Sequence, residues 1–265
     1  MARAARRSPA AKARKPARQV RGGDSRLPID VQVEAAVAAL KKASTRNDRE
    51  NLKRFGITAE KALGVSMANI QRLAKELGRS HELAAALWDT GWYEARLLTA
   101  FVDEPDRVTA AQMERWCRDF DNWGICDTLC FKLFDRSPHA WTKVAHWHGR
   151  PEEFVKRTAF ALIASLALHD RQAPDAKFIE SLRYIESAAS DDRNFVKKGV
   201  SWALRAVGRR NRALNCEAIA VARRLADSTE PAARWIGKGA LRELTSPAVR
   251  RGVDGRAAAS TTFKD

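Results

Sequence analysis

From Ile29 onward, apolar residues recur at helical spacing, and helix start and stop signals interrupt them about every fifteen to twenty residues. Alternation of β-branched and polar residues, which is the pattern of a strand, is absent over any useful length. The chain is therefore predicted to be all-α, with roughly a dozen short amphipathic helices. The expected helices span residues 30–41, 47–54, 66–77, 80–88, 92–102, 109–120, 121–134, 192–207, 215–225 and 231–244, and three more open at Ser137-Pro138, Arg150-Pro151 and Ala173-Pro174.

Short connections between these helices force consecutive helices to lie antiparallel, so they pair into αα-hairpins. Hairpins that bury one face against the next build an α-solenoid, whose curvature provides an extended concave surface. A globular, non-repetitive helical bundle is the alternative, because no consensus of fixed period marks the repeats. We predict the solenoid over residues 29–246, a basic arm over 1–28 and a frayed tail over 247–265.

The charge of the chain is strongly positive. Lys and Arg number 48 against 32 Asp and Glu, a formal net charge of +16, which favours phosphate polyanions or acidic membrane surfaces as partners. Residues 1–26 are rich in Arg, with Asp24 as their acid, and hold too few apolar residues to build a core. We expect a disordered arm that attracts phosphate, against a plain solvated tail or an organelle transit peptide. No apolar run approaches the roughly eighteen residues of a membrane span, which excludes a spanning protein.

Four cysteines in 265 residues, none in a CxxC pair, do not form a disulfide framework. This usage predicts reduced thiols in a cytoplasmic compartment. Cys126 and Cys130 stand four residues apart, and His146 and His148 follow, a set of ligand types that zinc accepts. The spacing matches no usual zinc finger and both cysteines lie among apolar residues, so we expect core cysteines, no metal and no cofactor. Glycine-rich phosphate loops and GxSxG nucleophile motifs are absent from the sequence as well.

Tryptophan is frequent, with eight in the chain, and one lies in the polar stretch DNWGICD. With Asp121 as N-cap of a helix, Trp123 and Asp127 are four residues apart and share one helical face. An indole beside a carboxylate makes an apolar wall with a fixed negative charge, which suits stabilisation of cationic character on a sugar. A core tryptophan beside a surface aspartate fits the same residues.

Basic and aromatic residues are interleaved farther along the chain. Arg157 lies one turn into a helix and could offer its planar guanidinium to phosphate or to a carboxylate such as Asp127, or could be an ordinary surface arginine. Phe195 and Trp202 are seven residues apart and share a face, among many cations. Aromatic rings among cations suit nucleic-acid backbone and sugar contacts, and a solvated basic face is the alternative. The side chains that we expect to contact nucleic acid are Phe195, Lys197, Lys198, Arg205, Arg209 and Lys238.

Taken in order, these stretches resemble the AlkD-like family of DNA alkylation repair glycosylases. The most specific parts are Trp123 with Asp127, then Arg157, then the Trp-Ala-Leu-Arg that begins at Trp202. Gly124 departs from the larger residue that the family pattern leads us to expect after the tryptophan. The matching segments are GVSMANIQRLAKELG (64–78), ELAAALWDTGWYEARLLTAFV (82–102), DNWGICDTLC (121–130), EFVKRTAFALI (153–163) and NFVKKGVSWALRAVGRRN (194–211), which cover most of residues 30–245.

The resemblance implies a curved superhelix of HEAT-like antiparallel helix pairs with a basic concave groove. It also implies a monofunctional N-glycosylase that removes cationic N3- and N7-alkylpurines from duplex DNA in base excision repair. Asp127 would be the catalytic carboxylate, Trp123 and Trp202 would contact the deoxyribose, and Arg157 would orient and contact the backbone. The alternatives are a non-catalytic helical-repeat DNA-binding protein and a protein-interaction scaffold. We expect a monomer, cytoplasmic and associated with the nucleoid, that binds alkylated double-stranded DNA and no membrane.

Overall fold

The computed structural model describes residues 27–261, so residues 1–26 of the expected basic arm lie outside the described residues. Helices fill this range, and no strand occurs in it. Two short 3-10 helices, Pro105–Arg107 and Phe134–Arg136, stand between longer helices. The α-helices of the described range are α1 (Ile29–Lys42), α2 (Arg46–Arg54), α3 (Met67–Leu77), α4 (His81–Asp89), α5 (Tyr93–Val102), α6 (Ala110–Arg118), α7 (Trp123–Lys132), α8 (Ala140–Trp147), α9 (Glu153–His169), α10 (Asp175–Ser187), α11 (Asn194–Gly208), α12 (Arg212–Ala226), α13 (Pro231–Leu244) and α14 (Pro247–Thr261).

Hydroxyl N-caps begin several helices where the sequence predicts them. The side chains of Ser66, Ser80 and Thr109 each accept a hydrogen bond from the backbone N–H three residues on, which satisfies a donor that the first helical turn leaves unpaired. Helix α13 runs over the predicted residues, 231–244, with Pro231 at its first position.

Other helix starts differ from the prediction by a few residues. Asn122, and not Asp121, caps α7, because its side-chain oxygen accepts from Ile125 N at 3.0 Å. The Ser137 hydroxyl accepts from the backbone N–H of His139 inside a turn, so α8 begins only at residue 140. Helix α9 begins at residue 153, two residues after its proline.

The C-terminal part of the described chain differs most from expectation. Asn211 caps α12, so that helix starts at residue 212 and not at 215. Helix α14 covers most of the segment that the sequence leads us to expect as a frayed tail. Ser246 accepts from the backbone N–H of Val249 at 3.4 Å, and Val253 is buried, which gives this helix a cap and a packed side chain.

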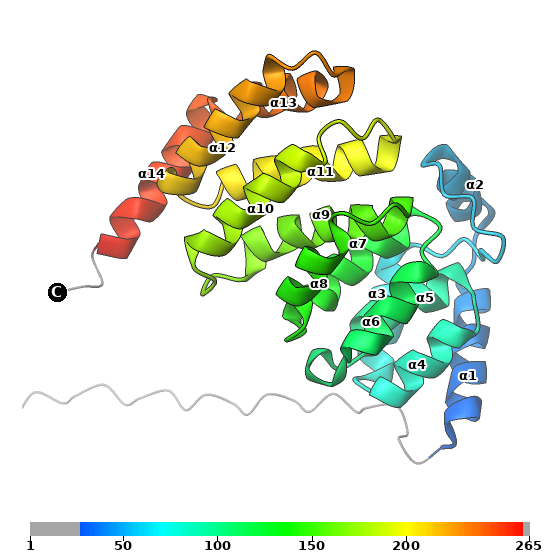
Figure 1. The fold of residues 1–265 in the computed structure, drawn as a ribbon. Helices are drawn as coiled ribbons and strands as arrows, with labels where there is room; N and C mark the ends of the chain where they lie inside the picture. Colours follow the sequence, from blue (N-terminus) through cyan, green and yellow to red (C-terminus); the bar gives the residue numbers. More distant parts are fainter. Residues whose placement is uncertain (1–26, 262–265) are drawn as a thin grey trace, which may run out of the picture.

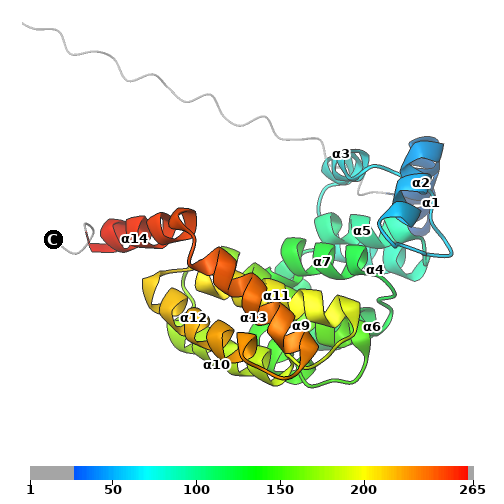
Figure 2. The same ribbon diagram turned by 90° about the horizontal axis from the view of Figure 1, so that it is seen from above.

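Consecutive helix pairs stack in two layers, as an α-solenoid requires. We call α3, α5, α7, α9, α11 and α13 the inner layer, in which each helix packs on the next. Helices α4, α8, α10 and α12 pack behind them and form the outer layer (Figure 1). Seen from above, the chain makes an arc, with α5 and α7 toward one side and α10 and α12 toward the other (Figure 2). The predicted solenoid, and not a globular bundle, is confirmed.

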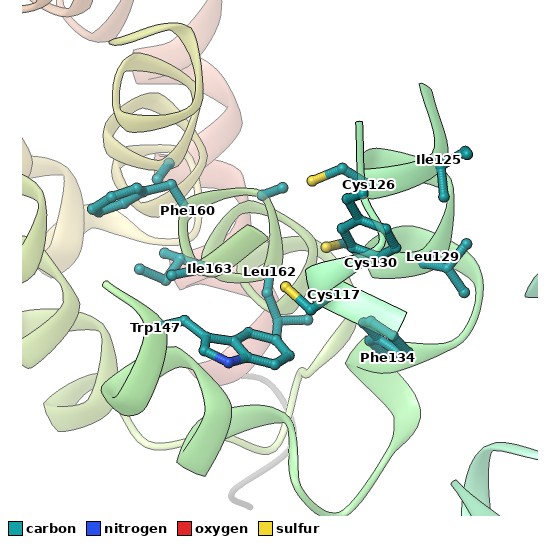
Figure 3. Close-up of a cluster of buried hydrophobic side chains, with 14 of the residues drawn as sticks. Cys117, Ile125, Cys126, Leu129, Cys130, Phe134, Trp147, Phe160, Leu162 and Ile163 are labelled. Atoms are coloured by element: carbon teal, nitrogen blue, oxygen red, sulfur yellow. The ribbon is translucent and has the colours of Figure 1, made fainter. Parts of the chain in front are cut away.

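Helix α9 is the centre of the core. Every residue from Arg157 to Ala167 is buried, because α7, α8 and α11 all pack against this helix. Figure 3 shows the sulfur atoms of Cys126 and Cys130 among apolar side chains of α7 and α9. Both thiols are fully buried, and the sulfur of Cys126 lies 3.3 Å from the Thr158 hydroxyl oxygen. The expectation of core cysteines is therefore confirmed.

The described residues contain no helix that is both long and apolar enough to cross a bilayer.

Candidate functional site

Asp127 of α7 and Arg157 of α9 form a bidentate ion pair between neighbouring inner-layer helices. Nε of Arg157 donates to Oδ1 of Asp127 at 3.0 Å, and Nη2 donates to Oδ2 at 2.7 Å. Nη1 donates to the backbone carbonyl of Phe195 at 2.7 Å, so one guanidinium ties α7, α9 and α11 together. Of the partners that the sequence allows for Arg157, the structure shows the carboxylate. The Arg157 side chain is 7% exposed and is no ordinary surface arginine.

The two charges of this pair are held in a poorly solvated place. The Asp127 side chain is only 18% exposed. Burial raises the pKa of the Asp127 carboxyl, while the charge and hydrogen bonds of Arg157 act against that rise. Burial also favours loss of the Arg157 proton, but the Asp127 carboxylate outweighs it and raises the pKa of Arg157. An anion in such surroundings acts on a neighbouring positive charge more strongly than it would in water.

Trp123 lies one turn before Asp127, at the first position of α7, and is half-buried. Its Nε1 donates to the backbone carbonyl of Phe55, just after α2, at 3.0 Å. Gly124 has a packing reason, because a Cβ at this position would lie 2.7 Å from the hydroxyl oxygen of Tyr93. Glycine therefore stands here in place of the expected larger residue because Tyr93 of α5 fills the space. The orientation of Trp123 is fixed by its hydrogen bond to Phe55.

Trp202 of α11 contacts α7 one turn after Asp127, at Phe131. Its ring stacks on Phe131, with 4.8 Å between the centroids and 2° between the planes. Phe131 lies one turn after Asp127, so the two tryptophans flank the carboxylate along α7. Trp202 and Arg157 also line one pocket of about 400 Å³. The structure thus brings Asp127, Arg157 and Trp202 to one place, with Trp123 a turn away.

Sequence reasoning missed Phe131, although the i, i+4 spacing from Trp123 through Asp127 continues to it. The ring of Phe131 is also nearly perpendicular to the ring of His169, with centroids 5.8 Å apart. His169 Nδ1 lies 2.5 Å from an oxygen of the buried Asp135. A second carboxylate with a histidine partner is therefore connected to Phe131 through the ring of His169.

The predicted DNA-contact residues on α11 and at its C-cap divide by whether they line the 400 Å³ pocket. Lys198, Arg205 and Arg209 line the 400 Å³ pocket. Phe195 is half-buried, and its ring packs on Phe154 with centroids 5.3 Å apart. Lys197 lies over the ring of Trp235, 5.5 Å from its centroid. DNA contact by each of these residues stays a prediction.

Glu243 of α13 neutralises part of this basic surface. It lies 2.9 Å from Arg205 Nη1 and 2.6 Å from Arg209 Nη2. Lys238 lines a neighbouring pocket of about 350 Å³ together with Trp235. Neither Trp235 nor Glu243 stands out in the sequence, because each acquires its basic neighbours only when α13 packs on α11.

The two histidines of the possible zinc ligand set, His146 and His148, lie in different surroundings. His148 stacks on Tyr184, with ring centroids 3.9 Å apart, and His146 is exposed. Across the described part of the chain, no group of three or more His, Cys, Asp or Glu is arranged to hold a metal ion.

Residues 36–244 match the family whose description is "DNA alkylation repair enzyme". The chain belongs to this DNA alkylation repair enzyme family. The match covers most of the chain and confirms the resemblance found in the motifs around Asp127, Arg157 and Trp202.

Among solved structures, the chain is similar to a member of a new family of proteins related to the HEAT-like repeat DNA glycosylases, with affinity for branched DNA structures. The two are 17% identical, with a TM-score of 0.65 over 80% of this chain and 95% of that chain. A designed armadillo repeat protein also matches, at 13% identity and a TM-score of 0.31, over 84% of this chain and 96% of that chain. No curated protein matches the sequence. The first likeness supports a HEAT-like repeat fold for this member of the DNA alkylation repair family.

Proposed function

We propose that the protein is a monofunctional DNA N-glycosylase that excises cationic N3- and N7-alkylated purines from duplex DNA, as the first step of base excision repair. One observation carries this proposal. The Asp127 carboxylate is fixed by a buried guanidinium, and Trp123 and the stacked pair Phe131–Trp202 flank it along α7. Membership of the DNA alkylation repair enzyme family supports the choice of substrate.

The chemistry of an alkylated purine explains why one carboxylate suffices. Alkylation at N3 or N7 gives the base a positive charge, so it leaves without a strong general acid. The bond between C1′ and N9 breaks, its electron pair neutralises the purine, and positive charge develops on the deoxyribose. Asp127 stabilises that charge across a short distance in surroundings of low polarity. A water then adds to C1′ and gives up its proton to Asp127. Neutral purines, which lack the charge, are left in place.

The remaining residues of the site then have separate roles. Trp123 and Trp202 contact the deoxyribose and exclude bulk solvent from it, apart from the attacking water, which strengthens the electrostatic effect of the carboxylate. Arg157 orients Asp127, because two of its nitrogen atoms hold both carboxylate oxygens. Lys198, along with the other basic side chains of the inner layer, binds phosphate and supplies affinity without sequence preference.

The test is the release of 7-alkylguanine from methylated duplex DNA by the parental protein and by Asp127→Asn. The substitution keeps the shape of the side chain and removes its charge. We expect excision to fall at least about tenfold, because single electrostatic groups in active sites contribute on that scale or more. Affinity for unmodified duplex stays largely intact.

Asp170→Asn is the matched control for this test. Asp170 lies just after the C-terminal end of α9 and accepts hydrogen bonds from Trp141 Nε1 and from the backbone of Ala173, both at 3.0 Å. It should excise at the parental rate. Parental excision by Asp127→Asn would remove the catalytic assignment.

A second candidate function is a binding protein for branched DNA that performs no catalysis. The structurally similar protein has affinity for branched DNA structures, and the same basic inner layer would serve that purpose here. Base release separates the two functions, because the ion pair of Asp127 with Arg157 would join α7, α9 and α11 in a pure binder as well. Tight binding of a four-way junction, without base release from methylated DNA, would favour this second function.

A further inference from the structure

The two tryptophans of the candidate site are held in different ways. Nε1 of Trp123 donates to the backbone carbonyl of Phe55, which fixes the direction of that indole. Nε1 of Trp202 has no hydrogen-bond partner within residues 27–261, and the stack on Phe131 is the contact that sets the plane of its ring. A stacked contact orients one ring only if the other ring is itself held in place. The orientation of Trp202 therefore depends on what holds Phe131.

Phe131 lies in the last turn of α7, where a helix frays most readily, so it needs support from another element. The ring of His169 gives that support from a second direction. The planes of the two rings are 78° apart, with 5.8 Å between the centroids, which is a favourable arrangement for aromatic rings. Trp202 lies parallel to Phe131 and His169 nearly perpendicular to it, so together they leave the Phe131 ring little room to turn.

His169 is the last residue of α9, and it is anchored to a carboxylate beneath the surface. Its Nδ1 lies 2.5 Å from Oδ2 of Asp135, which belongs to the 3-10 helix Phe134–Arg136. The Asp135 side chain is 0% exposed, against 37% for His169. The Ser165 hydroxyl donates to the same carboxylate oxygen. A carboxylate accepts hydrogen bonds, so Nδ1 carries the hydrogen and Asp135 sets the direction of the His169 ring.

Asp135 makes this contact at a cost in stability. Its Oδ1 atom is buried and accepts no hydrogen bond from the described residues, and a buried polar atom without a partner destabilises a protein. Asp103, which follows α5, is as deeply buried and binds His81 Nδ1 at 2.7 Å, but both of its oxygens accept hydrogen bonds. The two pairs have the same chemistry, and the pair at His169 leads on to Phe131. An incompletely bonded acid is explained there if the direction of His169 matters to the site.

We propose that Asp135 and His169 are positioning residues for the proposed reaction, which hold Phe131 so that the Trp202 ring keeps the orientation in which it contacts the deoxyribose. This inference rests on the proposed function for the sugar as the group that Trp202 contacts. Neither residue touches the reacting atoms, because each acts through the next ring. Changes at this pair therefore alter excision without altering affinity for the duplex, which the basic side chains of the inner layer supply.

The first measurement needs no DNA. In protein labelled with fluorotryptophan, fluorine NMR gives a resonance for each tryptophan, and the resonance of Trp202 is the one that disappears in Trp202→Phe. A ring stacked on the indole shifts that resonance, so removal or rotation of the Phe131 ring should move it. We expect the resonance to move in Phe131→Leu and in His169→Asn, and to return toward its parental position in Phe131→Tyr.

His81→Asn is the matched control for His169→Asn. Asparagine keeps an N–H near the place of Nδ1, so each variant can still donate to its buried aspartate, and each loses an imidazole ring. The ring at 169 contacts Phe131, whereas no aromatic ring among the described residues contacts that of His81. His81→Asn should therefore leave the Trp202 resonance and the excision rate at their parental values.

The second measurement is single-turnover release of 7-alkylguanine from methylated duplex, with binding of unmodified duplex measured beside it. We expect the rate to fall about tenfold in Phe131→Leu and about fivefold in His169→Asn, because small displacements of positioning groups reduce rates on this scale or more. Phe131→Tyr should recover most of the rate. Affinity for the unmodified duplex stays parental, so the loss falls on kcat and not on KM.

The proposal is overturned if the Trp202 resonance keeps its parental position in Phe131→Leu or in His169→Asn, or if it moves as far in His81→Asn. Excision at the parental rate by folded His169→Asn, or a loss of duplex affinity as large as the loss of rate, would also overturn it. A parental protein that releases no base from methylated DNA would refute the glycosylase instead. The fluorine resonance would then still decide whether Asp135 and His169 orient Trp202.

Discussion

Two ion pairs of this protein join neighbouring helices, and their carboxylates are equally exposed but differently surrounded. The Asp127 side chain is 18% exposed and the Glu114 side chain is 19% exposed. Asp127 has one cation, Arg157. Glu114, on α6, accepts from Lys143 Nζ at 2.8 Å and from Trp147 Nε1 at 2.9 Å, and Arg118 lies 3.3 Å away. Glu114 has more donors, and Asp127 loses more of its solvation to burial.

Their pKa values move in opposite directions for this reason. Burial tends to raise the pKa of Glu114, but the hydrogen bonds from Lys143 and Trp147 and the nearby charges lower it to about 2. For Asp127 the effect of burial prevails and the pKa is raised. Glu114 thus anchors α6 to α8, while Asp127 is held by Arg157 alone in surroundings where burial disfavours its charge.

The largest expected effect comes from removal of the cation that holds Asp127. Arg157→Ala leaves a poorly solvated carboxylate without its partner, so the neutral acid is favoured and its orientation is lost. We expect release of 7-alkylguanine to fall on the order of a hundredfold. Single-turnover rates on methylated duplex measure this loss.

Arg224→Ala is the matched control, because Arg224 makes the same bidentate contact with Glu186, at 2.7 and 2.9 Å, while its side chain is 58% exposed. Its excision should be unchanged. An Arg157→Ala protein that is folded and excises as fast as the Arg224→Ala protein would show that the pair has no part in catalysis.

An intermediate effect is expected on stability at the structural pair. Glu114→Gln leaves Lys143 buried without its anion, so the free energy of unfolding should fall by about 2 kcal/mol at pH 7. Because the folded pKa of Glu114 is below its ordinary value, its contribution is complete above pH 4.5 and is lost as the pH falls through about 2.

Urea titrations of the two proteins between pH 7 and pH 2 should therefore converge at the acid end. Glu50→Gln, which removes the exposed partner of Arg46, should leave the midpoint unchanged at every pH. A constant difference between Glu114→Gln and the parental protein down to pH 2 would contradict the pKa assignment.

The smallest expected effect is a displacement of the pH dependence of excision. Catalysis needs the Asp127 carboxylate, so the rate is present above its pKa and lost as the pH falls through it. Since burial raises that pKa, the acid limb of the pH–rate profile should lie above 3.8, the ordinary value for aspartate. Base release measured from pH 8 downward gives the profile, and an acid limb at or below 3.8 would contradict a raised pKa.

The sequence predicts much of the fold, because helical periodicity and hydroxyl caps are local signals. Ser66, Ser80 and Thr109 each begin a helix as predicted. Asp121 and Asn122 are both good cap residues, and only the three-dimensional contact with Ile125 N decides between them. The helix after Ser246 is not predicted from the sequence, because the burial of Val253 comes from packing and not from periodicity.

The residues of the candidate site also fall into those that the sequence identifies and those that it does not. Asp127 and Arg157 are identified from the sequence because the resemblance is strongest there, and the carboxylate is one of the two partners the sequence allows for the guanidinium. Phe131 and Trp235 are not, since their significance lies in neighbours from other helices, Trp202 in one case and Lys197 in the other. Residues that act through partners far away in the chain leave no local spacing to recognise.

The buried cysteines beside the site bear on how the protein endures the agents that damage DNA. Alkylating electrophiles attack thiolates as readily as purine nitrogens, and a thiol is inert while it keeps its proton. Burial raises the pKa of Cys117, on α6, and of Cys130, on α7, whose sulfur atoms both lie against α9 (Figure 3). Cys216, on α12, is the thiol that meets solvent. The buried thiols next to the helices that carry Asp127 and Arg157 are thus protected from alkylation.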